Sequence, residues 1–167
     1  MKTESYPLHH RSEVVVAADP DSVFARLDDH RRLASHMEKP SLMTAGASMR
    51  IDTDSLGGKA VGSMIRMTGR MLGMTLALDE VVTERTPPHR KVWVTVGEPR
   101  LLVVGGYRMG FEIAPQGNAS RLAVFIDYRL PSRGLARILG LLFGRSYAAW
   151  CTRRMASDAE AGWTGQR

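Results

Sequence analysis

One carboxylate in this chain occupies a position suited to proton transfer inside an apolar space. In the stretch 74–82, Glu80 shares one side of the expected strand with Met74, Leu76 and Leu78, because successive strand residues point to opposite faces. A carboxyl group among apolar side chains has the shifted pKa that general acid/base chemistry needs. The alternative is a bulge that turns Glu80 toward solvent, so the side on which it lies decides whether this chemistry is open to the chain.

The other strand carboxylates fall on the opposite face, together with arginines. Alternation sends Asp52, Asp54, Glu112 and Asp127 outward. Exposed ion pairs of this kind contribute little and form solvated ladders. The arginines available to pair with them across strands are Arg50, Arg66, Arg108 and Arg121.

Two tyrosines share the inner face with Glu80. Tyr107 and Tyr128 each combine an apolar ring with one hydroxyl, which suits them to hold a ligand carbonyl or phenol. The alternative is that both are core residues whose hydroxyls reach the backbone or water.

The sequence gives little support for a metal site or for a catalytic nucleophile. His9 and His10 lie near the start of the chain, and the six-residue spacing of His30 and His36 does not place two imidazoles one helical turn apart. There is no Cys pair and no H-E-x-x-H or G-x-S-x-G motif. Cys151 follows Trp150 on a helix, where a free cysteine is typically a small packed hydrophobe. We therefore predict no metal and no cofactor.

The elements that position these groups follow a simple order. A short apolar strand (13–18) runs into a helix capped by Asp19 and Pro20, and a second short helix (29–37) places Leu33 and Met37 inward. Strands alternating with turns follow up to residue 130, and Pro131 and Ser132 open one long helix. The pattern predicts an α+β helix-grip fold, a curved seven-stranded antiparallel sheet around that helix. The expected strands after the first are about 47–54, 61–71, 74–82, 91–96, 101–113 and 119–130.

The inner strand faces carry many methionines, of ten in the chain. Methionine fills irregular cores, but it also lines adaptable binding sites. We therefore predict a cavity between sheet and helix, with Leu135, Ile138, Leu139, Leu142, Phe143, Ala149 and Trp150 forming the inward stripe of the helix. The predicted ligand-binding residues are Met49, Met67, Met74, Leu76, Leu78, Tyr107, Met109, Phe111, Val124, Ile126, Tyr128, Leu139, Phe143 and Trp150.

The first half of the long helix contains Gly134, Gly140 and Gly144. Glycine weakens a helix by about 1 kcal/mol relative to alanine, so this half is a candidate lid that moves to admit a bulky ligand. The alternative is that the glycines permit close packing against the sheet.

Composition places the chain among ordinary globular proteins. Its 167 residues suit one domain, expected at 11–160, with flexible termini at 1–10 and 161–167. The net charge of +6 is spread in runs of at most two cations, which favours a solvated surface over a nucleic-acid site. One cysteine, no apolar leader and no long apolar run predict a cytoplasmic protein. A monomer and a homodimer both remain open.

With this order of elements in view, the chain resembles the polyketide cyclase/dehydrase-like branch of the START/Bet v 1 superfamily (SRPBCC). The likeness spans about 13–158 and its motifs mark a fold more than a reaction. The resemblance implies a cavity for lipids, sterols, polyketides or other hydrophobic molecules. The residues that carry it are 19–24 with Leu27, Asp29 and Leu33, the strand start Val61-Gly62-Ser63, the stretch 84–89 with its proline pair, and 139–150 in the last helix.

Three functions are consistent with the sequence. The first is binding of a hydrophobic small molecule, and the second is cyclisation or dehydration of a polyketide-like substrate with Glu80 or a tyrosine moving the proton. A buried Glu80 within hydrogen-bond reach of Tyr107 or Tyr128 favours the second. The third is docking on a membrane surface or partner through Leu141, between Arg137 and Arg145, although one exposed leucine needs no explanation.

Overall fold

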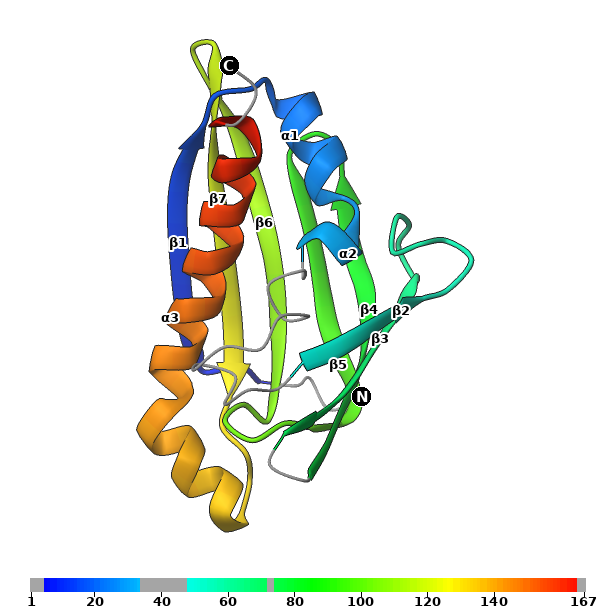
Figure 1. The fold of residues 1–167 in the computed structure, drawn as a ribbon, viewed down its shortest axis with the longest axis vertical. Coiled ribbons are helices and arrows are strands. Elements are labelled where there is room, and N and C mark those ends of the chain that lie inside the picture. The colour runs from blue at the N-terminus through cyan, green and yellow to red at the C-terminus, as the bar shows by residue number, and fades with distance from the viewer. Residues whose placement is uncertain (1–4, 34–47, 72–73, 165–167) are drawn as a thin grey trace.

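The computed structural model describes residues 5–33, 48–71 and 74–164. Within them, a seven-stranded antiparallel sheet in the order β1-β7-β6-β5-β4-β3-β2 curves beside one long helix (Figure 1). The α+β helix-grip prediction is confirmed. The elements are β1 (Leu8–Val16), α1 (Pro20–Leu27), α2 (His30–Leu33), β2 (Ser48–Thr53), β3 (Met64–Met71), β4 (Met74–Thr86), β5 (Arg90–Arg100), β6 (Gly106–Gln116), β7 (Ala119–Arg129) and α3 (Gly134–Thr164).

Both ends of the described chain are more ordered than expected. β1 begins at Leu8, before the predicted strand start at 13, because residues 8–16 pair with β7 along their whole length. His10 Nδ1 lies 2.8 Å from Thr152 Oγ1 of α3. At the other end α3 runs past Asp158 to Thr164, since Trp163 packs against the core.

The predicted start of the first helix is confirmed. The Asp19 side chain accepts a hydrogen bond from the Ser22 backbone N–H at 2.9 Å, and Pro20 occupies the first turn. Val23, Phe24 and Leu27 form the buried face of α1. α2 ends at Leu33, and Met37 lies outside the described residues.

The strands differ from the expected ones between β5 and β6. β5 continues through Gly97 to Arg100, and β6 begins only at Gly106 instead of residue 101. The pair Gly105-Gly106 thus opens a strand instead of bending its middle. A Cβ atom on Gly105 would lie 2.6 Å from the Leu130 carbonyl oxygen, so the chain can approach β7 this closely only with glycine here.

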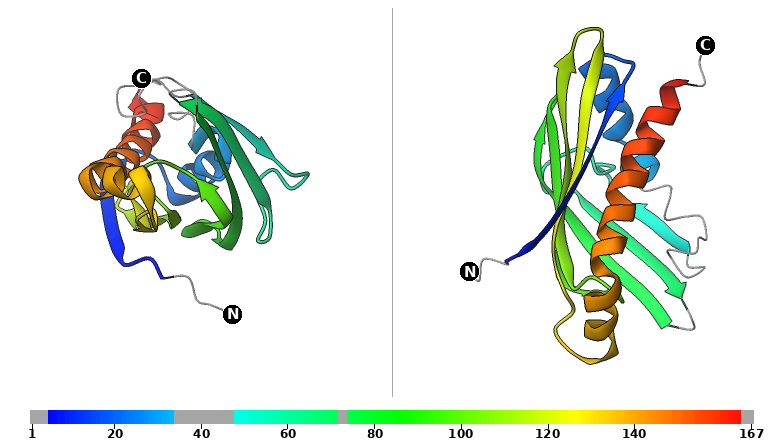
Figure 2. Two further views of the ribbon diagram at one scale, coloured as in Figure 1. Left: turned by 90° about the horizontal axis from the view of Figure 1, so that it is seen from below. Right: turned by 90° about the vertical axis from the view of Figure 1, so that its left-hand side faces the viewer.

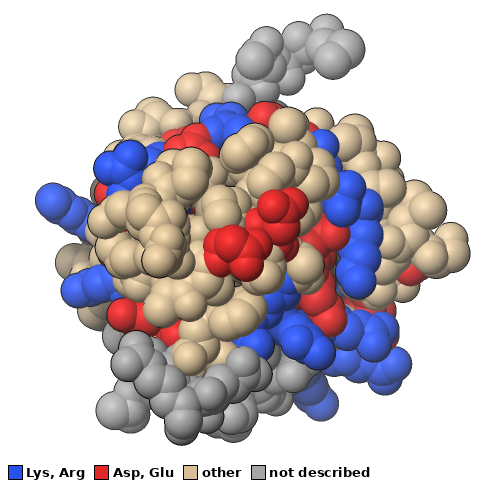
Figure 3. Space-filling model, turned by 90° about the horizontal axis from the view of Figure 1, so that it is seen from above, with Lys and Arg blue, Asp and Glu red and all other residues tan. Residues whose placement is uncertain are grey.

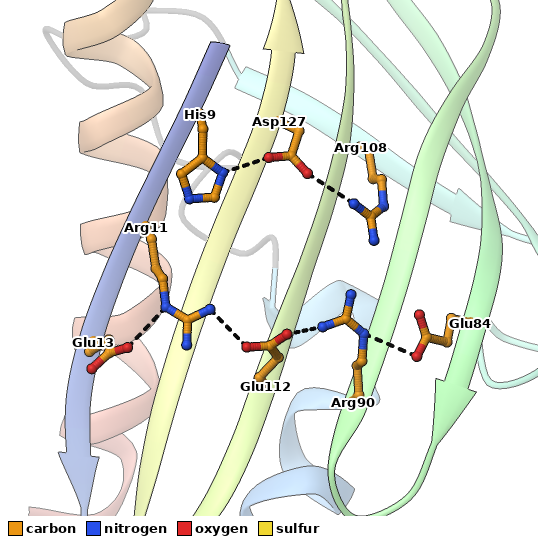
Figure 4. Close-up of polar contacts among 8 residues, drawn as sticks. All are labelled: His9, Arg11, Glu13, Glu84, Arg90, Arg108, Glu112 and Asp127. Atoms are coloured by element: carbon orange, nitrogen blue, oxygen red, sulfur yellow. Dashed lines mark hydrogen bonds and ion pairs between the residues drawn. The ribbon is translucent and has the colours of Figure 1, made fainter. Parts of the chain in front are cut away.

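The sheet separates an apolar inner face from a charged outer face, as alternation predicts. Outside, Arg11 bridges Glu13 and Glu112, Arg90 bridges Glu112 and Glu84, and Asp127 accepts from His9 and Arg108 (Figure 4). Arg66 pairs with Asp79 at 2.7 Å and Arg121 is exposed, whereas Arg129 is half-buried. Asp54 caps the following turn, where Ser63 and the Met64 backbone donate to it.

The long helix packs along β1 and β7, at one side of the sheet (Figures 1 and 2). Its packed face is the series Gly140, Gly144, Ala148, Cys151 and Met155, one helical turn apart. A Cβ on Gly140 would lie 2.8 Å from Pro131 Cδ and 3.0 Å from the Val103 carbonyl oxygen. The glycines therefore permit close packing, the second of the two predicted roles.

This packing overturns the predicted inward stripe of the helix. The glycine face touches Val103 of the β5–β6 connection and Leu130 and Pro131 after β7, so most of the large residues of the first half are left in solvent. Leu139 and Trp150 are half-buried and Ala149 is buried. Leu135, Ile138, Leu142 and Phe143 are exposed. None of the helices in the described ranges has the length and apolar character required to cross a membrane.

Candidate functional site

Glu80 lies on the inner face of the sheet and is fully buried, at 0% exposure. In β4 it pairs with Ile65 of β3 and Thr95 of β5. Irregularities occur in the β4–β5 pairing on both sides of it, yet Leu76, Leu78, Glu80 and Val82 keep strict alternation. The alternative that a bulge turns Glu80 to solvent is excluded. The second irregularity, after Val82, places Glu84 on the outer face with Arg90.

Tyr107 is the partner of this carboxylate. Its hydroxyl donates a hydrogen bond to Glu80 Oε1. Thr95 fixes the Tyr107 backbone, since its Oγ1 accepts from the Tyr107 N–H at 3.1 Å and lies 3.3 Å from the carbonyl oxygen. Burial of the hydroxyl raises the pKa of Tyr107 well above its usual value, and the nearby Glu80 carboxylate raises it further. Tyr107 is therefore a neutral hydrogen-bond donor at physiological pH.

A second pair of side chains reaches the same region from α3. Tyr147 hydrogen-bonds Cys151, and burial raises the pKa of Cys151 to about 12. Burial is also the main reason that the pKa of Tyr147 lies well above its usual value, with contributions from Cys151 and Glu80. A thiol held neutral in this way is no nucleophile. Sequence reasoning missed Tyr147, although its four-residue spacing to Cys151 places both on one side of a helix.

The polar group lies where two apolar clusters meet. One cluster lies between β5–β7, α1 and α3, the other within β2–β4, and both Tyr107 and Leu101 pack against each. Of the predicted lining residues, Met49, Met67, Leu76 and Leu78 belong to the second cluster. The first cluster contains Met109, Phe111, Val124, Ile126 and Tyr128, with Trp150 packed against it.

Two predicted lining residues are misplaced. Met74 is 43% exposed, since it starts β4 opposite Met71, at the end of the β3–β4 pairing. Phe143 is 53% exposed, on the side of α3 away from the sheet.

A separate buried charge cluster was not foreseen. Lys91, at 0% exposure, donates to the Asp28 carbonyl oxygen at 2.8 Å and to Asp28 Oδ1 at 3.0 Å. Arg85 Nη2 donates to the same carboxylate at 2.8 Å. Burial lowers the pKa of Lys91, and Asp28 partly offsets this. The cluster ties the end of α1 to β4 and β5, away from the Glu80 region.

A curved antiparallel sheet gripping a long C-terminal helix is the helix-grip fold of the Bet v 1-like class. Within that class, the family described as polyketide cyclase / dehydrase and lipid transport matches residues 8–160. The chain belongs to this family, as the resemblance implied.

Solved structures agree on the fold. Norcoclaurine synthase from Thalictrum flavum aligns with a TM-score of 0.64 and 16% identity, over 96% of this chain and 87% of that one. The Zhui aromatase/cyclase from Streptomyces sp. R1128 aligns with a TM-score of 0.61 and 15% identity, over 92% and 93%. The allergen Ara h 8.0201 gives a TM-score of 0.60 at 9% identity, over 95% and 99%. No curated protein matches the sequence.

Proposed function

We propose that this protein binds a hydrophobic small molecule (a lipid, an isoprenoid or a polyketide-like compound) between the inner face of the sheet and α3. The observation that carries the proposal is the buried Glu80–Tyr107 pair, which lies between the two apolar clusters. Family membership points the same way. A ligand that buries ~300 Å² of apolar surface gains about 7 kcal/mol before its entropic costs.

The polar pair gives the ligand an orientation. A ligand hydroxyl placed near Tyr107 can donate to the phenol oxygen, and a ligand carbonyl can accept the phenol proton in place of Glu80, which holds that proton in the structure. The phenol stays protonated because burial raises the pKa of Tyr107. The apolar remainder then lies against side chains such as Met67, Met109 and Ile126. Apolar area supplies the affinity and the hydroxyl supplies the selectivity.

Native mass spectrometry of protein purified from its own host tests this directly. We expect a co-purifying hydrophobic mass that is lost on denaturation. The emptied protein should then take up a fluorescent fatty acid, an isoprenoid alcohol or an aromatic polyketide. Absence of a bound mass, together with no uptake of any of the three probes, contradicts the proposal.

A matched pair of variants locates the binding site. Tyr107→Phe should weaken binding of a carbonyl-bearing probe about tenfold, the value of one hydrogen bond. Asp79→Asn, one residue from Glu80 but on the outer face with Arg66, should leave affinity unchanged. Equal affinity of Tyr107→Phe and wild type places the ligand elsewhere.

The same pair supports a second candidate function, a polyketide cyclase or dehydratase. Buried Glu80 in contact with Tyr107 is the arrangement that favours an enzyme over a simple carrier. Glu80 would remove a proton from the carbon between two ketones, while the Tyr107 hydroxyl hydrogen-bonds the developing enolate oxygen. The enolate carbon forms a bond with a second carbonyl carbon of the same chain, and the new alkoxide takes the proton back from Glu80. Loss of that hydroxyl with a neighbouring proton, as water, then completes a dehydration.

A short poly-β-ketone thioester provides the assay for this function. Wild type should accelerate ring formation, Glu80→Gln should abolish the acceleration while retaining binding, and Asp79→Asn should match wild type. If wild type binds the thioester but does not speed its cyclisation, the protein is a carrier and the enzymatic candidate fails.

A further inference from the structure

The first half of α3 carries a patch of large apolar side chains that face solvent. We call this set the α3 patch. Each member exposes more than half of its surface: Leu135 69%, Ile138 56%, Leu141 63%, Leu142 66% and Phe143 53%. Single exposed apolar residues are ordinary, but five gathered on the nine helical residues 135–143 mark an interaction site.

The patch follows from how the helix is packed. At about 100° per residue, Leu135, Ile138 and Leu142 lie opposite to Gly140 and Gly144, which touch Pro131, Leu130 and Val103. Leu141 and Phe143 lie on the two flanks. The first turns of α3 also project beyond the ends of β1 and β7 (Figures 1 and 2). The patch is therefore presented at one end of the molecule.

The charged residues of the segment that carries the patch have one sign. The stretch 128–157 contains six arginines and no Asp or Glu. Arg133, immediately before α3, and Arg137 and Arg145 on α3 are all exposed. At the opposite end of the molecule, acidic and basic side chains are interspersed (Figure 3).

We propose that the α3 patch docks the protein on the surface of a membrane that contains anionic phospholipid. In this arrangement the first half of α3 lies in the plane of the interface, with the apolar side chains among the acyl chains and the arginines at the phosphates. The binding is peripheral, and it is independent of what the interior holds.

Charge complementarity favours this occupant over a second copy of the chain. A two-fold contact through the patch would bring the same arginines of both copies together, with no carboxylate of 128–157 to neutralise them. An anionic lipid surface supplies the opposite charge and an apolar phase at once.

Vesicle co-sedimentation of the whole protein tests the proposal. Vesicles of phosphatidylcholine alone are compared with vesicles that also contain phosphatidylglycerol, at low and at physiological salt. We expect binding to the anionic vesicles, weakening as salt screens the arginines, and little binding to phosphatidylcholine alone. No binding to anionic vesicles at low salt overturns the proposal.

Two double variants separate the contributions. Leu142→Gln with Phe143→Gln should weaken binding at least about tenfold, because it removes two apolar anchors. Arg133→Gln with Arg145→Gln should weaken it about thirtyfold, since each cation near an anionic surface contributes about fivefold. All four residues are exposed, so the circular-dichroism spectrum and the melting temperature should stay at wild-type values.

Matched controls come from elsewhere on the surface. Leu56→Gln with Val61→Gln changes two side chains that are 52% and 60% exposed. They belong to the loop between β2 and β3, across the molecule from α3 in Figure 1. Arg121→Gln removes one exposed arginine near the β6–β7 hairpin. These controls should bind like wild type.

The remaining outcomes are equally decisive. If the patch variants bind anionic vesicles as tightly as wild type, the membrane contact lies elsewhere and the proposal is wrong. If wild type is a dimer in native mass spectrometry, ignores vesicles, and becomes a monomer in the Leu142 and Phe143 variant, the patch joins two copies and the proposal is again wrong.

Discussion

The buried Glu80–Tyr107 pair should lower the stability of the protein. Glu80 lies between Leu78 and Val82 on the inner face of β4, at 0% exposure. Removing a carboxylate from water costs several kcal/mol even after relaxation, and hydrogen bonds return only part of it. Residues selected for packing alone would be apolar at such a position, as their neighbours are.

One single variant and one double variant measure this cost. Tyr107→Phe alone should lower the free energy of unfolding by about 2 kcal/mol, because it removes a hydrogen bond to a buried carboxylate. Glu80→Met with Tyr107→Phe removes both polar groups and keeps the volume similar, so it should raise the free energy of unfolding by about 1–4 kcal/mol. With about 2–4 °C for each kcal/mol in a domain of this size, the double variant should melt at least about 2 °C above wild type.

Urea unfolding followed by tryptophan fluorescence gives the free energies, and calorimetry gives the melting temperatures. Arg66→Gln with Asp79→Asn is the control, since this exposed pair on the outer face should change stability by less than about 1 kcal/mol. The reasoning is refuted if the double variant at Glu80 and Tyr107 is less stable than wild type. That result would make the pair a structural contact that the fold requires.

Three further predictions concern other parts of the molecule. Asp28→Ala should lower the free energy of unfolding by about 3–5 kcal/mol, because it leaves Lys91 buried without its counter-ion. Asp29→Ala breaks only a hydrogen bond from the Arg31 backbone N–H and an exposed contact with Arg32, so it should cost no more than about 1 kcal/mol in the same urea titration. Burial opposes ionisation of Asp28, but the hydrogen bonds and charges of Arg85 and Lys91 hold its pKa below the usual 3.8. The contribution of the Asp28 carboxylate to stability is therefore present at neutral pH and is lost as the pH falls below about 4. Melting curves against pH should show this loss in wild type and not in Asp28→Ala. Gly140→Ala should destabilise the protein by about 1–3 kcal/mol although alanine has the better helix propensity, because the new methyl group meets Pro131 Cδ at 2.8 Å. The control is Ser146→Ala, at an exposed position of the same helix, which should be neutral or stabilising in thermal melting. If residues 134–144 act as a lid, their amide hydrogen exchange should slow when a hydrophobic ligand binds, and equal exchange in both states would make this part of the helix a fixed wall.

The alternation of apolar and polar residues predicted correctly which strand residues face inward, because burial of one face of the sheet requires this alternation. Glu80, Tyr107 and Tyr128 lie on the inner face, and Asp127 with Arg108 on the outer face, where the alternation of side chains places them. The cap at Asp19 was equally readable, since its hydrogen bond to Ser22 is local in the chain. Local capping geometry and the alternation of side chains along strands were therefore sufficient to predict most of the fold.

The orientation of α3 was not readable from the same pattern. The helix does have an apolar face in its first half, with Leu135, Leu142 and Phe143, but that face points to solvent. Periodicity shows that a face is apolar and does not show what covers it. Lys91 was missed for a related reason, because its partner Asp28 reaches it only through tertiary contact. The pair Tyr147 and Cys151 has helical spacing, but that spacing does not show that the Tyr147 hydroxyl lies near Glu80.

The two halves of α3 differ in the free energy needed to separate them from the rest of the protein. Beyond Gly144 the helix is held by buried side chains such as Ala148, Cys151 and Met155, and lifting it would expose them to water. Before Gly144 the contact surface is glycine against Pro131 and the Val103 backbone, and the large side chains are already outside. Separation of this half from the sheet therefore uncovers little new apolar area, so the helix should fray from its first turn inward while its second half keeps the domain folded.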